Sequence, residues 1–114
     1  AGALAALCRV LRPGGTLTAI EGDHGSTLFH PGSAATRAAI ACQVELQRRA
    51  GGDALIGRRL YPLLHHAGLR GIRVSPRMAC AEAGRPAMVE AFIRRTFTPL
   101  IAAVRAAALG AGLA

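Results

Sequence analysis

A short polar stretch near the start of the chain holds the residue types that acid–base chemistry needs. Glu21, Asp23 and His24 lie close together, directly after the apolar segment 16–20. A histidine beside carboxylates can take a proton from a hydroxyl or an amine, because its side chain titrates near neutral pH. We therefore predict His24 as a general base, with Glu21 and Asp23 as substrate-binding groups. The alternative is an ordinary polar loop, in which Asp23 caps a turn and His24 faces solvent.

Two further residues are candidates for contacting a substrate. His30 precedes Pro31 in the same polar stretch, although turn chemistry alone also accounts for it. Tyr61, the only tyrosine, lies near the start of an apolar helical segment. It could face a substrate pocket or simply pack as a half-buried ring.

The pattern of histidines and cysteines predicts no metal site. A site built from His24, His30, Cys42 or Cys80 would need residues that no close spacing brings together. With Cys8, the cysteines are odd in number and form no CxxC pair. We therefore expect reduced thiols and a cytoplasmic protein. No apolar run is long enough to cross a bilayer, so no membrane partner is expected.

The formal net charge of +8 comes from arginine alone, because the chain contains no lysine. A basic chain is suited to nucleic acid, yet these arginines are scattered from Arg9 to Arg105, often in pairs such as Arg48–Arg49. There is no long basic run and no interleaving with aromatic side chains. The pattern favours solvated helix faces over a nucleic-acid interface.

Apolar spacing and turn residues predict helices alternating with strands. Apolar residues at helical spacing predict helices over 3–11, 34–50, 55–67 and 86–108. Ser33 is the expected N-cap of the second helix. Short apolar segments predict strands over 16–20 and 72–81. This order is typical of an α/β fold.

Two features predict that the chain is part of a larger domain. No capping residue precedes the first helix. Two strands also make a poor sheet, and the first of them is suited to burial on both faces. We therefore expect exposed strand edges, through which the chain could form a homodimer.

Two segments resemble one enzyme family. Residues 6–20, ALCRVLRPGGTLTAI, resemble the segment of class I S-adenosylmethionine-dependent methyltransferases that joins a helix to the fifth strand of the sheet. Residues 60–74, LYPLLHHAGLRGIRV, resemble the segment that leads into the sixth strand. The resemblance covers residues 3–82. The family's glycine-rich cofactor loop, similar to GxGxG, has no counterpart here, because Gly110–Ala111–Gly112 follows a helix instead of a strand.

The resemblance implies a partial Rossmann-like α/β fold and a transferase function. Residues 1–114 would form a single partial domain, with 26–54 and 84–108 as helical insertions or a lid. The parent enzyme would transfer a methyl group from S-adenosylmethionine to an oxygen, nitrogen or carbon atom of a small-molecule acceptor. The chain holds no cofactor-binding residue of that family, so we expect it to be inactive alone and not to bind the cofactor. The alternative is a non-catalytic basic helical module that binds a protein or an anionic ligand.

Overall fold

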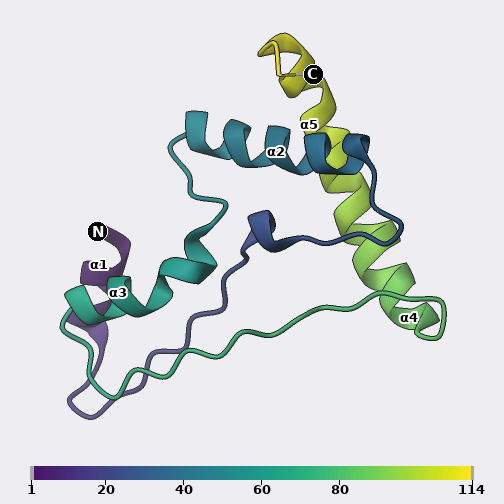
Figure 1. Cartoon of the computed structure of the whole chain (residues 1–114). Coiled ribbons are helices and arrows are strands. Elements are labelled where there is room, and N and C mark those ends of the chain that lie inside the picture. The colour runs from purple at the N-terminus through teal and green to yellow at the C-terminus, as the bar shows by residue number, and fades with distance from the viewer. Residues whose placement is uncertain (1, 114) are drawn as a thin grey trace.

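The computed structural model describes residues 2–113, and the regular elements in this range are all helical. In chain order they are α1 (Gly2–Val10), η1 (His24–Ser26), α2 (Ala34–Arg49), η2 (Ile56–Arg59), α3 (Leu60–His66), α4 (Pro86–Met88), η3 (Val89–Phe97) and α5 (Thr98–Gly110). The elements η1 and η2 are 3₁₀ turns, and η3 is π-helical. Long extended segments join α1 to η1 and α3 to α4 (Figure 1).

The predicted Rossmann-like α/β fold is wrong, because no strand occurs between residues 2 and 113. Segments 16–20 and 72–81 are extended, but their N–H and C=O groups form no backbone hydrogen bond with each other or with any other described residue. A strand exists only where a neighbouring backbone completes its ladder. The apolar pattern predicted strands, but among residues 2–113 these segments have no neighbouring backbone that would make them a sheet.

The predicted helices are confirmed with small shifts at their ends. The helix predicted over 3–11 is α1, and the helix predicted over 34–50 is α2. Ser33 caps α2 as expected, since its Oγ accepts the N–H of Thr36 at 3.0 Å. The helix predicted over 55–67 is divided into η2 and α3. It ends at His66, and Gly68 follows the C-cap Ala67 with a φ of 83°, which suits glycine.

The last predicted helix, 86–108, is formed without a break, but its backbone hydrogen-bonding pattern changes along its length. It begins as α4, runs through the π-helical η3 and becomes α-helical at Thr98. Pro99 follows at once and has no N–H to donate within the helix. No helix among residues 2–113 is long and apolar enough to span a membrane.

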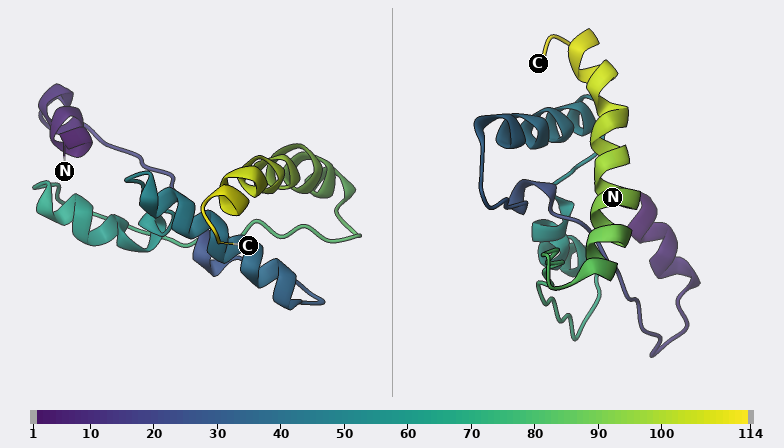
Figure 2. Two further views of the ribbon diagram at one scale, coloured as in Figure 1. Left: turned by 90° about the horizontal axis from the view of Figure 1, so that it is seen from above. Right: turned by 90° about the vertical axis from the view of Figure 1, so that its right-hand side faces the viewer.

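Helices α2 and α5, which are far apart in the sequence, pack against each other (Figures 1 and 2). Cys42 Sγ lies 3.0 Å from the carbonyl of Leu113, and Arg49 Nη1 donates to the carbonyl of Ala111 at 3.2 Å. Phe29, in the segment after η1, lies against Phe97 of η3, with ring centroids 5.8 Å apart. Helix α2 lies within the range 26–54, and α4, η3 and most of α5 lie within 84–108.

The molecule is open. Its radius of gyration is 17.0 Å, whereas a compact chain of this length would have about 13 Å. Its accessible surface is 8842 Å², against about 5,900 Å² for a compact monomer of the same mass. Among the described residues, the buried apolar side chains are Ile40, Ala54 and Ala108. Much apolar surface therefore remains in contact with water.

Candidate functional site

The loop around η1 is held against the segment that leads into η2. The backbone N–H of His24 donates to the carbonyl of Ala54 at 2.9 Å, and the N–H of Gly57 donates to the carbonyl of Gly22 at 3.0 Å. A Cβ atom at Gly57 would lie only 2.8 Å from that carbonyl oxygen. The close approach of the two backbones therefore requires glycine at position 57.

The carboxylate of Asp23 is held by two side chains. Arg58 donates from Nη2 to Oδ1 at 2.7 Å and from Nε to Oδ2 at 2.9 Å, and Ser26 Oγ donates to Oδ2 at 2.7 Å. These hydrogen bonds, first from Arg58 and then from Ser26, hold the pKa of Asp23 below its ordinary value of 3.8. Asp23 was predicted as a substrate-binding group, and both of its oxygens are engaged in fixing the loop.

The imidazole of His24 is held by a buried amide. Gln43 Nε2 lies 3.0 Å from His24 Nδ1, and the Gln43 side chain is fully buried in α2. Because Nδ1 is occupied, Nε2 is the ring nitrogen left for a ligand. A Cβ atom at Gly22 would lie 3.3 Å from Nε2, so glycine at this position leaves space beside that nitrogen.

The amide orientation of Gln43 decides what His24 Nε2 can do. When the amide nitrogen faces Nδ1, as here, the proton of a neutral imidazole is on Nε2, which then donates a hydrogen bond. When the amide oxygen faces Nδ1, that nitrogen carries the proton and Nε2 can accept another. In the present orientation Gln43 Oε1 is buried without a hydrogen-bond partner among the described residues. In this orientation the pair therefore holds one unsatisfied polar atom.

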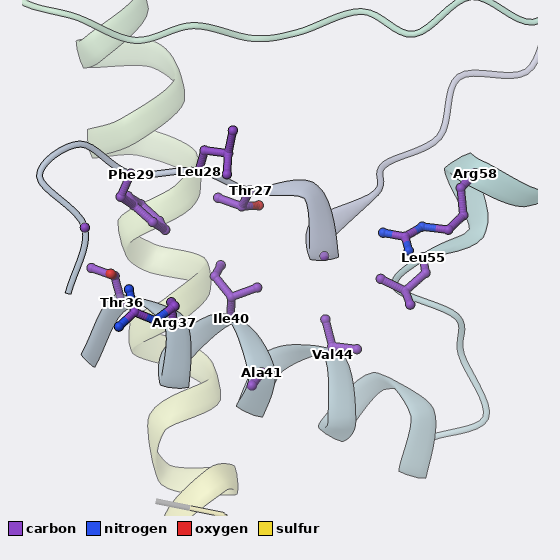
Figure 3. A pocket seen from close by; sticks show the side chains of 12 residues that line it. Thr27, Leu28, Phe29, Thr36, Arg37, Ile40, Ala41, Val44, Leu55 and Arg58 are labelled. Carbon is purple, nitrogen blue, oxygen red and sulfur yellow. The ribbon is translucent and has the colours of Figure 1, made fainter. Parts of the chain in front are cut away.

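An open hollow of about 550 Å³ lies beside the loop, between it, α2 and η2 (Figure 3). Its walls are mainly apolar and include Leu28, Phe29, Ile40, Val44 and Leu55. Arg37 and Arg58 lie at opposite ends of it. Gly25 and Thr27 line it, while His24, which lies between them and Gly22 in the same loop, contacts Gln43 instead.

The remaining predicted residues are not brought to this hollow. Glu21 is exposed and forms no hydrogen bond or ion pair with residues 2–113. His30 is exposed and does not line the hollow. Tyr61 is on α3, where its exposed ring stacks on His65 with centroids 6.2 Å apart. Asp23 and His24 are adjacent in the chain, and each is held by a different partner, Arg58 and Gln43 respectively.

Three residues of the site were not predicted. Gln43 follows Ile40 by three positions, so helical spacing places both on one face, and this signal was available in the sequence. Arg58 is 35 residues from Asp23 and no local pattern links them. Arg37 is an exposed residue of α2, and no pattern in the sequence singles it out. Within residues 2–113 no three histidine, cysteine or acidic side chains lie close enough to hold a metal ion.

Comparison with known proteins adds no family to this description. No protein-family model matches the chain, and no curated protein matches it. The resemblance of residues 6–20 and 60–74 to methyltransferases therefore stays a prediction from sequence.

Proposed function

We propose that this chain supplies the acceptor-binding side of a small-molecule methyltransferase that uses S-adenosylmethionine. The observation that carries the proposal is the fixed position of His24, whose Nδ1 is held by buried Gln43 while Nε2 is left for a ligand. The loop that carries His24 is also held through Asp23 and Arg58. Residues that act on a substrate need such support, because small displacements cost much of the rate.

The described residues do not fit a site for the cofactor itself. Gly110 and Gly112 lie at the end of α5, and no strand precedes them within residues 2–113. We therefore assign to this chain only the acceptor and its proton. His24 Nε2 would take the proton of an acceptor hydroxyl or amine when the Gln43 oxygen faces Nδ1–H.

The test uses both the chain and the complete product of the gene that encodes it. In calorimetry we expect no micromolar binding of S-adenosylmethionine to the chain alone. The complete gene product should transfer a labelled methyl group to acceptors drawn from phenols, aromatic acids and amines. His24→Asn should lower turnover about 100-fold or more, as expected for loss of a general base.

The matched control is His66→Asn on α3, which should leave turnover unchanged. A complete gene product that fails to bind S-adenosylmethionine would refute the proposed function. Equal turnover of the His24 and His66 variants would refute the role of His24.

A second candidate is a protein-binding module, and the open surface favours it. Residues 73–80 are all exposed, and within the described range they form no backbone–backbone hydrogen bond, although the carbonyl of Cys80 accepts from Arg85 Nη1 at 3.3 Å. Val74 is 46% and Met78 83% exposed. An extended segment with free N–H and C=O groups can accept a strand from a partner, which would also cover such apolar side chains.

Sedimentation at several salt concentrations distinguishes the partners for this second candidate. A homodimer of a chain with net charge +8 should strengthen as salt screens the repulsion. A complex with an acidic polypeptide such as poly-glutamate should weaken over the same range. A monomer that binds no polypeptide at any salt concentration would eliminate this candidate.

A further inference from the structure

The polar groups that line the hollow are mostly engaged within the chain. Thr27 Oγ1 donates to the carbonyl of His24 at 2.8 Å, and Thr36 Oγ1 belongs to the cap of α2 with Ser33. The guanidinium of Arg58 is paired with Asp23. None of these groups is free to recognise a charged ligand.

Arg37 is the exception among these lining side chains. Its guanidinium forms no hydrogen bond and no ion pair with any residue from 2 to 113. No carboxylate belongs to the lining, so nothing neutralises this charge locally. An arginine in this position offers a planar pair of donors that matches a carboxylate.

We propose that the hollow binds a small molecule with an apolar ring system and a single carboxylate. The carboxylate pairs with Arg37, and the rings pack against Phe29, Ile40 and Val44. The volume of about 550 Å³ is within the range of small-molecule sites. One available guanidinium suits the single charge of a carboxylate better than a phosphate dianion.

If the proposed function holds, the ligand of the hollow is the class of methyl acceptor, and this part of the assignment rests on that function. Binding itself needs neither S-adenosylmethionine nor transfer, so the two ideas can fail separately. If the chain binds the probe but the complete gene product transfers no methyl group, the binding site stands and the proposed function is refuted. If the gene product transfers a methyl group but the chain does not bind the probe, only the binding site is refuted.

The probe is 2-naphthoate, with 2-naphthamide as its uncharged counterpart, in an NMR titration of the chain. We expect naphthoate to shift the backbone amide signals of Ile40 and Val44 and to bind about fivefold more tightly than naphthamide. Arg37→Gln should abolish that preference. The control Arg105→Gln removes an exposed arginine on α5, outside the hollow, and should preserve the preference.

Four outcomes overturn the proposal. Naphthoate and naphthamide bind equally, the Arg37 and Arg105 variants behave alike, or no probe shifts the signals of the hollow. Inorganic phosphate that competes as well as naphthoate also overturns it, because the site would then take any anion.

Discussion

Gln43 on α2 and His24 in the loop before it meet at 3.0 Å, amide nitrogen to ring nitrogen, with the Gln43 side chain fully buried. A polar side chain is costly to bury unless it is hydrogen-bonded, and this contact satisfies the amide nitrogen of Gln43 but not its oxygen. It also ties the imidazole to the most buried helix of the molecule. The loop and α2 therefore behave as one unit at this point.

Gln43→Met should remove the preference of the neutral His24 ring for one tautomer. Methionine keeps the length of the side chain but cannot hydrogen-bond to Nδ1, so a single neutral tautomer should become a mixture of both. Imidazole ¹⁵N chemical shifts measure this directly. His66 is an internal reference, because its Nδ1 lies 2.7 Å from the carbonyl of Pro62 and must carry the proton when the ring is neutral. If the His24 spectrum is the same in Gln43→Met and wild type, the role of Gln43 is contradicted. If the neutral His24 ring of the wild type carries its proton on Nε2 alone, this argues against His24 as a general base.

Gly57→Ala should separate the loop from the segment before η2. The new Cβ would lie 2.8 Å from the carbonyl oxygen of Gly22, a backbone atom that cannot move without the loop. We expect a loss of about 1–3 kcal/mol and faster exchange of the His24 amide hydrogen. Gly84→Ala is the matched control, since its Cβ would meet nothing within 4 Å. Equal stability of the two variants would contradict the close approach.

Arg58→Met should make the stability of the chain less sensitive to acid. The pKa of Asp23 is lowered in the folded chain by its hydrogen bonds to Arg58 and Ser26. Such a group stabilises the fold above its unfolded pKa, and this contribution is lost as pH falls through the lower folded pKa. The wild type should therefore melt higher than Arg58→Met by a constant amount above about pH 5, and this difference should shrink below about pH 4.

Melting curves from about pH 2 to pH 7 measure this difference. Arg105→Met is the control, because Arg105 forms no ion pair with residues 2–113 and its melting difference should not vary with pH. A difference between wild type and Arg58→Met that grows on acidification would contradict the pairing. Glu45, whose hydrogen bonds to Arg48 and Arg49 lower its pKa to about 2, titrates alike in all of these variants.

Local features of the fold were predictable from the sequence. The capping of α2 by Ser33 and the end of α3 just before Gly68 depend on a few adjacent residues. The positions of the four predicted helices follow from apolar spacing, which is equally local.

Features that depend on distant partners were not predictable. Whether an extended segment becomes a strand depends on a neighbouring backbone, which residues 2–113 do not provide. The loop at Asp23 depends on Arg58, and nothing near either residue indicates the other. His24 was predicted as a site residue from its type and position, but its contact with Gln43 was not predicted, since glutamine is usually an exposed residue.

The segment between α3 and α4 has one more consequence. It crosses the molecule with residues 73–80 exposed, and it contains Arg73 and Arg77, where trypsin can cut. The chain on either side of such a cut is still held together by α2 and α5 and by Phe29 and Phe97. The uncut segment therefore acts as a tether that sets a high effective concentration for α5 at α2. Cutting it would turn an intramolecular contact into a bimolecular one, so the stability of the nicked protein would depend on its concentration.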